Sequence, residues 1–290
     1  MATITKTMTK QQIDDLRRRI EPLAKSVKQP AYTYFQIKLT DMTITAYQSG
    51  KVVYQGKDLS FMENDEKPSA PSASSASSFP QAGSDEVGTG DYFGPVVVSA
   101  CIVYEKDAAE LKSLGIDDSK KMTDEKIREY APIVKKLCPH TILVVSNEKY
   151  NRVHERFNMN GIKAVLHNQA YLNLIRKGYE LPALCVVDQF ARPATYYAHL
   201  KNEKEVVRTL TFQTKAESAY LAVACASVLA RSTFLEYFDK MEEKYDFHFE
   251  KGASGKVDAC AARFVDKFGW QELGKVAKLH FKNTEKIRDL

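Results

Sequence analysis

A long polar segment divides this chain. Residues 63–83 include the tract PSAPSASSASS at 68–78, which contains almost nothing that a folded core can bury. Segments of this composition are flexible linkers. A chain of 290 residues is also long for one average domain and short for three. We therefore predict two domains, over residues 1–62 and 84–290, joined by a linker over residues 63–83.

The predicted N-terminal domain begins with a helix. Residues 9–12, Thr-Lys-Gln-Gln, form a capping-box sequence, and apolar residues then recur near one helical face. These residues are Ile13, Leu16, Ile20 and Leu23. Alternating apolar residues at 32–39 and 42–46, and a Ser49-Gly50 turn into 51–54, predict three strands. We expect a small α+β domain in which one face of an antiparallel sheet stays free.

Charge is distributed unevenly along the chain. The net charge is +5, and residues 1–62 carry ten Lys and Arg against five acidic residues, which accounts for the whole excess. A basic module of this kind suits a polyanionic partner. Ordinary solvated faces of a small domain would give the same count, so both interpretations stay open.

Composition also indicates a class of protein. No run of 18 or more apolar residues predicts a membrane span, and residues 1–6 lack the apolar segment of a secretory signal. The five cysteines are odd in number and widely spaced, without a zinc motif. We expect a cytoplasmic protein with reduced thiols and no membrane partner.

The predicted C-terminal domain alternates buried strands with helices. Apolar runs predict strands at 96–103, 142–145 and 183–187, and helical spacing predicts helices at 124–137, 147–157, 162–176 and 217–244. A strand-rich start with interleaved helices indicates a mixed α/β domain.

The sequence DEVGTGDYFGP at residues 85–95 contains the first candidate functional residues. Asp85 and Glu86 are unfavourable neighbours in a strand unless a cation lies between them. Gly88 and Gly90 leave backbone N–H groups open to a ligand. The motif therefore suggests a metal beside a phosphodiester, although a solvated surface hairpin would also accommodate it.

Two further acids extend this constellation. Asp188 ends a predicted strand, where α/β sheets commonly present functional groups. Glu217 lies at the start of the predicted long helix, where capping of the helix dipole is an alternative role. Four carboxylates suit two divalent cations such as Mg²⁺, which support phosphodiester hydrolysis without a protein nucleophile. A Ser-His-Asp triad has little support, because no Gly-x-Ser-x-Gly sequence is present.

These motifs resemble the type 2 ribonucleases H. The opening motif at 85–95 matches, DDSKKM at 117–122 is similar to the family's Asp-Ser-Lys-Lys-Leu, and Val187-Asp188 is similar to its second acidic strand end. Lys215-Ala216-Glu217 and ACASVLAR at 224–231 are similar to two later family motifs. The resemblance covers roughly residues 84–290, and it implies a ribonuclease H-like catalytic domain with a mixed sheet flanked by helices.

Departures from the ribonuclease HII pattern point to the ribonuclease HIII branch. The family's Gly-Arg-Gly turn is Gly88-Thr89-Gly90 here, the fourth acid is Glu217 where HII usually has Asp, and Ala253 replaces a tyrosine that HII uses at single-ribonucleotide junctions. The basic N-terminal domain is similar to the HIII extension, which has a TATA-binding-protein-like fold.

The resemblance implies an endoribonuclease that cuts the RNA strand of RNA–DNA hybrids with Mg²⁺ or Mn²⁺, leaving 5′-phosphate and 3′-hydroxyl ends. Asp85 is the implied bridging ligand of two ions, completed by Glu86, Asp188 and Glu217. Gly88, Thr89 and Gly90 are implied to meet the ribose 2′-hydroxyl. The remaining candidate substrate contacts are Ser119, Lys120, Lys121 and Lys215, although the first two lysines could equally be solvated.

The N-terminal sheet is a second candidate nucleic-acid surface. We expect a face with Tyr32, Tyr34, Gln36, Lys38 and Tyr47 to lie against the hybrid, unless the tyrosines pack under the helix. A monomer is expected. The alternatives are a ribonuclease HII-like enzyme that also nicks at single ribonucleotides, a metal-dependent DNA nuclease, and a non-catalytic nucleic-acid-binding protein.

Overall fold

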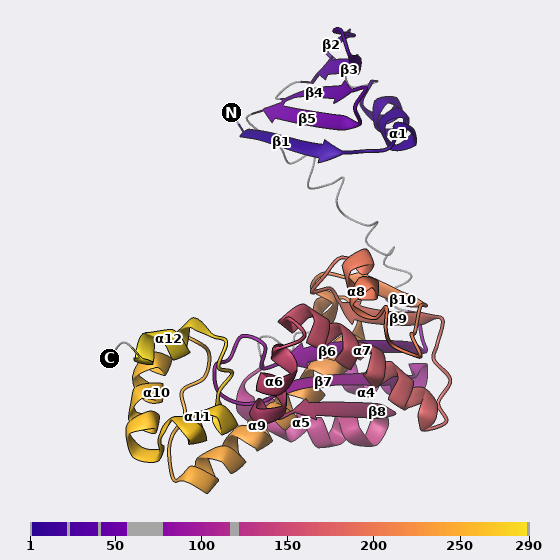
Figure 1. Cartoon of the computed structure of the whole chain (residues 1–290). Helices are drawn as coiled ribbons and strands as arrows, with labels where there is room; N and C mark the ends of the chain where they lie inside the picture. Colours follow the sequence, from indigo (N-terminus) through magenta and orange to yellow (C-terminus); the bar gives the residue numbers. More distant parts are fainter. Residues whose placement is uncertain (1, 22–23, 40–41, 57–77, 117–121, 289–290) are drawn as a thin grey trace. The chain divides into compact units, whose positions relative to one another are not determined.

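The chain divides into two compact units, Met1–Ala70 and Pro71–Leu290. A computed structural model describes residues 2–21, 24–39, 42–56, 78–116 and 122–288 (Figure 1). Most of the predicted linker lies outside the described residues. The second unit's first strand begins at Gln81, so residues 81–83 belong to the sheet rather than to the linker. Burial explains this, because Gln81, Ala82 and Gly83 are all enclosed.

The N-terminal unit is a five-stranded antiparallel sheet with one helix on it (Figure 1). Its elements are β1 (Ala2–Thr7), α1 (Lys10–Ile20), β2 (Ser26–Lys28), β3 (Thr33–Lys38), β4 (Met42–Tyr47) and β5 (Lys51–Gly56), with strand order β1-β5-β4-β3-β2. The predicted capping box is present at Thr9 and Gln12. Ile13, Leu16 and Ile20 are fully buried in one cluster with the sheet's inner face. The predicted helix, which ends at Ile20, and the three-strand meander are therefore confirmed, while Leu23 lies outside the described residues.

Tyr34 departs from the predicted polar sheet face. The pairing of β3 with β4 shifts between Thr33 and Phe35, so Tyr34 is the extra residue of a bulge. Bulges re-aim side chains. Tyr34 packs against the same apolar cluster as Phe35, and the Lys10 ammonium lies 4.5 Å from its ring centroid. For this residue, the alternative of a tyrosine packed near the helix holds.

The second unit contains a mixed five-stranded sheet in the order β10-β9-β6-β7-β8. Its strands are β6 (Gln81–Val87), β7 (Val96–Val103), β8 (His140–Val145), β9 (Leu184–Asp188) and β10 (Leu210–Gln213). β6 and β9 are parallel, as are β9 and β10, whereas β7 is antiparallel to both β6 and β8. The predicted mixed α/β domain is thus confirmed.

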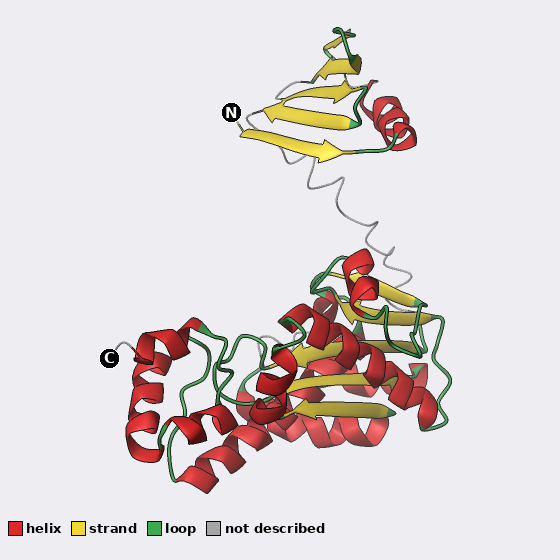
Figure 2. Cartoon of the chain, in the orientation of Figure 1, coloured by secondary structure: helices red, strands yellow, loops and turns green. Residues whose placement is uncertain are grey.

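Helices cover both faces of this sheet (Figure 2). They are α4 (Glu105–Ser113), α5 (Asp124–Leu137), α6 (Asn147–His154), α7 (Met159–Arg176), α8 (Pro193–His199), α9 (Leu221–Tyr245), α10 (Gly255–Phe268), α11 (Trp270–Val276) and α12 (Lys282–Arg288). One apolar cluster joins α4, α5 and α9 to β7, and another joins α7 and α8 to β6, β7 and β9. A third, rich in aromatic residues, joins α10, α11 and α12 to the end of α9.

The central helix α9 is apolar because it lies in this core. By length and composition it could cross a membrane, but 78% of its apolar window is buried inside the unit. A helix that is apolar all round is typical of a protein core. The five cysteines are all buried free thiols, as predicted from their spacing.

Candidate active site

Two of the predicted acids meet at the ends of adjacent parallel strands. The register of β6 and β9 pairs Ser84 with Val187, so Asp85 and Asp188 occupy the next positions side by side. Carboxyl ends of parallel strands lie at one edge of a sheet, which is where α/β proteins place ligands. The apolar run of each strand ends where its carboxylate begins, so the local sequence itself positions both groups.

Glu217 joins this edge from a short 3₁₀ helix. That helix, η3 (Ala216–Ser218), follows β10 and precedes α9. The expectation that Glu217 opens the long helix is therefore wrong, and a helix-capping role falls with it. The chain turns sharply at Lys215, whose φ of 55° is left-handed. This turn buries Glu217, whose side chain hydrogen bonds to Asp188.

The segment that contains Glu217 also binds Asp188. The backbone N–H of Ala216 donates to Asp188 Oδ1 over 3.0 Å. Burial raises the pKa of Asp188 to about 6, and the neighbouring Glu217 carboxylate adds to this rise. A neighbouring carboxylate disfavours the ionised form of an acid, because two like charges repel each other.

Asp85 is buried at 9% exposure, and Glu217 is more deeply buried at 2%. It accepts hydrogen bonds from the Glu86 backbone N–H, at 2.8 Å, and from the side chain of Ser227 on α9. Burial, then the charges of Glu86 and Asp188, raise the pKa of Asp85 to about 8. The surroundings of Asp85 therefore favour the protonated form of its carboxyl group.

Glu86 turns away from Asp85, to the opposite face of the sheet. Successive strand residues point to opposite faces, and Glu86 meets α7 instead of α9. Lys163 Nζ donates to its Oε1 over 2.6 Å, and His167 Nε2 to its Oε2 over 2.8 Å. Burial alone raises the pKa of Glu86, but these partners outweigh it and leave the pKa below its ordinary value.

This geometry corrects one sequence expectation. A cation directly between Asp85 and Glu86 is not what lets them be neighbours, because Lys163 already compensates Glu86. Neither Lys163 nor His167 was among the predicted site residues. Both lie on a helix whose residues are buried on several sides, so no periodic pattern set them apart.

The glycine loop after β6 is tightly constrained at one end and open at the other. Gly88 has φ 90°, and a Cβ there would lie 2.1 Å from the Pro95 carbonyl oxygen. Gly90 has nothing within 4 Å of its Cβ position. The first glycine is therefore required by the turn, while the second leaves the backbone accessible, with Thr89 half-buried between them.

The C-terminal segment holds this loop in place. Gly252 N–H donates to Asp91 Oδ1 over 2.7 Å, and Tyr92 N–H donates to the Gly252 carbonyl over 2.8 Å. The fully buried Lys278 donates its ammonium to the carbonyls of Asp91 and Gly94, at 2.8 and 2.5 Å. The segment containing Ala253 therefore borders the loop, whereas the part played by Lys278 had no counterpart in the sequence prediction.

The remaining predicted residues are less defined. Lys215 is exposed, two residues before Glu217. Ser119, Lys120 and Lys121 lie outside the described residues. Arg231 and Lys251 both bind Asp124, which begins the helix just beyond that segment. The predicted acids thus gather at one sheet edge, while most of the predicted phosphate contacts stay predictions.

The donor set fits hard divalent cations. All four candidate ligands are carboxylates, the ligand type that Mg²⁺ and Mn²⁺ prefer. Burial, with a smaller contribution from neighbouring carboxylates, raises the pKa values of Asp85 and Asp188, and a bound cation would favour their ionised forms. Within the described residues, no group of three or more His, Cys, Asp or Glu side chains is arranged so that it could hold a metal ion. Metal binding by these acids would therefore require their side chains to reorient.

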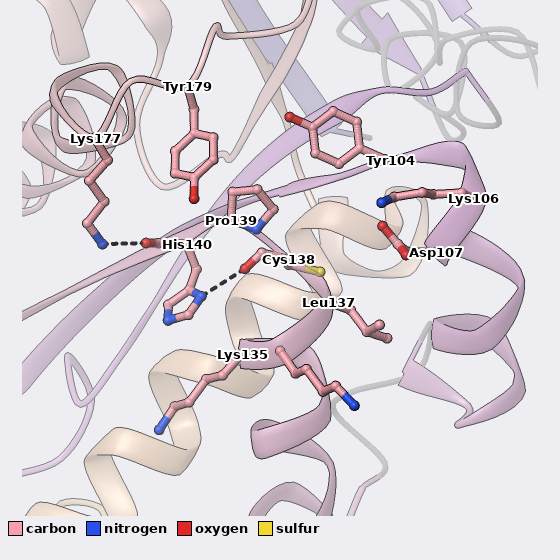
Figure 3. Close-up of a pocket in the computed structure, with 11 residues that line it drawn as sticks. Tyr104, Lys106, Asp107, Lys135, Leu137, Cys138, Pro139, His140, Lys177 and Tyr179 are labelled. Atoms are coloured by element: carbon pink, nitrogen blue, oxygen red, sulfur yellow. Dashed lines mark hydrogen bonds between the residues drawn. The ribbon is translucent and has the colours of Figure 1, made fainter.

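A separate recess of about 340 Å³ lies away from these acids (Figure 3). It is lined by basic and aromatic groups, including Lys106, Lys135, Lys177 and Tyr179. His140 lines it too, and it pairs with Cys101 at the end of β7 opposite the acidic edge. Figure 3 shows Lys177 donating to the His140 carbonyl, over 2.7 Å. This recess contributes nothing to the acidic site.

Comparisons with known proteins agree with the geometry. Residues 82–284 match the Ribonuclease HII family model, and residues 3–70 match a domain of unknown function (DUF3378). The chain is 40% identical over 293 residues to ribonuclease HIII of Bacillus mycoides strain KBAB4, covering 94% of each chain. The chain belongs to the ribonuclease HIII family. It is 39% identical to ribonuclease HIII of Streptococcus thermophilus strain ATCC BAA-491, over 99% of this chain and 98% of that protein.

Solved structures of ribonuclease HIII show the same architecture. A crystal structure of Bst-RNase HIII in complex with Mn²⁺ superposes with a TM-score of 0.74 at 34% identity, covering 99% of this chain and 98% of that one. Aquifex aeolicus RNase H3, at 22% identity and a TM-score of 0.55, shares the fold. The predicted family and fold are confirmed, and with them the enzyme class, a metal-dependent ribonuclease of the H type.

Proposed function

We propose that this chain hydrolyses the RNA strand of RNA–DNA hybrids, using two divalent cations and leaving 5′-phosphate and 3′-hydroxyl ends. The observation that carries the proposal is the meeting of Asp85, Asp188 and Glu217 at one sheet edge beside an open glycine loop. The structure of Bst-RNase HIII in complex with Mn²⁺ supports the use of a divalent cation by this chain.

The four acids have distinct parts in the proposed mechanism. Asp85, which lies beside Asp188 at the sheet edge, would be the ligand shared by Mg²⁺ or Mn²⁺ ions, and Glu86, Asp188 and Glu217 would be the further ligands. Bound cations would supply an activated water and stabilise the departing oxygen of an in-line displacement. Ser227 and the Ala216 N–H keep Asp85 and Asp188 oriented.

We expect the glycine loop to contact the ribose of the RNA strand. Gly90 is exposed and unobstructed, so a sugar can approach its backbone closely. A 2′-hydroxyl both donates and accepts, and it distinguishes RNA from DNA. The anchoring of Asp91 and Gly94 by Lys278 would keep the N–H groups of Gly88, Thr89 and Gly90 in fixed positions. Lys215, exposed beside Glu217, is the proposed contact near the scissile phosphate.

The outer sheet face of the N-terminal unit is the proposed substrate-binding surface. Gln36 Nε2 donates to Thr45 Oγ1 over 3.1 Å, which marks a polar face opposite α1. Strand register places Lys38 and Lys51 among threonines on this face. Tyr47 is partly exposed beside them, while Tyr32 is 81% exposed in the preceding turn. Phosphate contacts from such a face would raise affinity in a salt-dependent way.

Cleavage of three labelled duplexes tests the proposed function. A uniform RNA–DNA hybrid, a DNA duplex with one ribonucleotide, and plain DNA are incubated with Mg²⁺ or Mn²⁺. Asp85→Asn is compared with Asp266→Asn, a control on the exposed face of α10. We expect cutting of the hybrid's RNA strand only, lost in Asp85→Asn and kept in the control.

Other outcomes separate the alternatives. Strong nicking at the single ribonucleotide would show ribonuclease HII-like specificity and contradict the proposal that Ala253 removes it. Cutting of plain DNA would identify a general nuclease, and binding without cutting under either metal would leave a non-catalytic protein. A monomeric, cytoplasmic enzyme stays our expectation, which size-exclusion chromatography with light scattering checks for the oligomeric state.

A further inference from the structure

Both oxygens of Glu86 are held by side chains of one helix. Lys163 and His167 are four residues apart on α7, so they project from the same helix face. Lys163 binds Oε1 and His167 binds Oε2, at 2.6 and 2.8 Å. Lys163 is 8% exposed and His167 is fully buried. The Glu86 carboxylate is thus held by hydrogen bonds from two side chains, those of Lys163 and His167, which are almost inaccessible to solvent.

The hydrogen bonds behind Glu86 extend from α7 to strand β6. Ser84 Oγ lies 2.8 Å from His167 Nδ1, the ring nitrogen that does not face Glu86. One helical turn further on, Tyr171 interacts with the Ser84 hydroxyl and donates its own hydroxyl to the Val186 carbonyl over 2.7 Å. Val186 lies two residues before Asp188 on β9. A chain of hydrogen bonds therefore connects the Glu86 carboxylate to the strand that carries another candidate ligand.

An aromatic ring covers the pair. The Lys163 ammonium lies 4.1 Å from the ring centroid of Phe190, and the His167 ring stacks on the same phenyl group at 5.2 Å. Phe190 follows Asp188 by two residues. The cation–π contact replaces some of the hydration that Lys163 has lost. It also ties the position of the two α7 side chains to the loop leaving β9.

We propose that Lys163 and His167 are positioning residues that fix the Glu86 carboxylate for metal binding, with Ser84 setting the orientation of the histidine. This inference rests on the proposed metal site. Each carboxylate oxygen has two lone-pair directions, so one hydrogen bond per oxygen leaves a direction for a cation. Partners behind a ligating carboxylate of this kind tune metal affinity in known sites.

Stability alone gives no reason for this arrangement. A buried ion pair is often neutral or unfavourable compared with apolar residues of similar volume. The α7 face packs into an apolar cluster with β6, β7 and β9, where leucine or methionine would fit without any desolvation of charge. The hydrogen bonds from Lys163 and His167 have a clear purpose if Glu86 must direct its carboxylate oxygens toward a metal ion.

Titration calorimetry of Mn²⁺ into the full-length protein, without nucleic acid, tests the proposal. Ser84→Ala removes the hydrogen bond behind His167, and His167→Leu removes the one to Glu86. We expect each to weaken Mn²⁺ binding about 10-fold or more, within the range seen for outer partners of metal ligands. His167→Gln, whose amide can donate to Glu86 and accept from Ser84, should retain binding. Lys163→Met is less direct, because it also removes a positive charge that repels the ion.

Cys101→Ala is the matched control. Cys101 is also a fully buried residue of this sheet with a short side chain, its thiol donates to the Ala222 carbonyl over 3.2 Å, and it pairs with Gly83 instead of with a candidate ligand. It should share the stability loss of Ser84→Ala but keep wild-type Mn²⁺ affinity. In cleavage assays, the Mn²⁺ concentration for half-maximal rate should rise in Ser84→Ala, while the KM for hybrid at saturating Mn²⁺ stays unchanged.

The outcomes separate the two proposals. If Ser84→Ala binds Mn²⁺ as the wild type and Cys101→Ala do, Lys163 and His167 do not position Glu86, even if His167→Leu fails to fold. If the wild-type protein binds no Mn²⁺, the proposed metal site itself is overturned, and the positioning role with it.

Discussion

We predict that Lys278 makes the stability of the second unit depend on pH over a defined range. Its side chain is fully buried in the second unit, and its ammonium donates to the Asp91 and Gly94 carbonyls. Burial lowers the pKa of Lys278 from its ordinary 10.5 to about 7, against a smaller opposing effect of the Asp91 charge. The folded protein therefore binds the lysine proton much less tightly than the unfolded chain does.

The lowered pKa of Lys278 makes the free energy of unfolding depend on pH. Between pH 7 and 10.5 the unfolded chain binds more protons than the folded protein, so the free energy of unfolding rises with pH in that window. One unit of pKa difference corresponds to about 1.4 kcal/mol. Integrated from pH 7 to pH 9, the lysine should add about 2 kcal/mol of stability to the wild type relative to Lys278→Met, which has no proton to exchange.

The assay is guanidinium unfolding at pH 7, 8 and 9, followed by the fluorescence of Trp270. This is the only tryptophan in the chain and lies on α11, so it reports on the unit that contains Lys278. Lys256→Met, on the exposed side of α10, is the control and should show no such pH-dependent difference. Parallel curves for wild type and Lys278→Met from pH 7 to pH 9 would refute a lowered pKa for the buried ammonium.

Three further predictions concern the acidic site and the two units. Gly83→Ala should destabilise the second unit by about 3 kcal/mol, measured from denaturant midpoints, because its Cβ would lie 2.3 Å from the Val223 nitrogen. Asp85→Asn should melt above wild type in EDTA, by a margin that widens from pH 5 to pH 8, because burial raises the folded pKa of Asp85 and makes its ionisation costly; a constant margin would contradict this. Deleting residues 1–62 should raise the Kd for hybrid and flatten its dependence on salt; unchanged values would remove the N-terminal unit from substrate binding.

Sequence patterns predicted the parts of this fold that local chemistry determines. Asp85 and Asp188 each follow an apolar run, so their placement at strand ends needed no knowledge of tertiary contacts. The α1 capping box was recognisable for the same reason. β1 was missed because its only large apolar residue is Ile4, which pairs with Tyr54 near the far end of the N-terminal unit's sequence. A strand that depends on so distant a partner has little local pattern of its own.

Contacts between distant segments could not be predicted from the sequence for a different reason. α7 is buried on several sides, with Lys163 and His167 among apolar residues, so its sequence shows no single polar face. Lys278 likewise stands in an ordinary-looking C-terminal segment, and only the return of that segment to the glycine loop gives it carbonyl partners. Each is a charged side chain whose reason for burial lies on another element.

The dipeptide Asp85-Glu86 shows why adjacency in sequence misleads about adjacency of charge. Strand alternation sends Asp85 toward Ser227 on α9 and Glu86 toward Lys163 on α7, so the two carboxylates belong to different helical layers. Only Glu86 is compensated by a buried cation within the described residues near it. Burial raises the pKa values of Asp85 and Asp188 and so disfavours their ionised forms. A cation bound at the sheet edge would favour ionisation of that pair, and Glu86 would complete the site from the opposite face of the sheet, where α7 holds it.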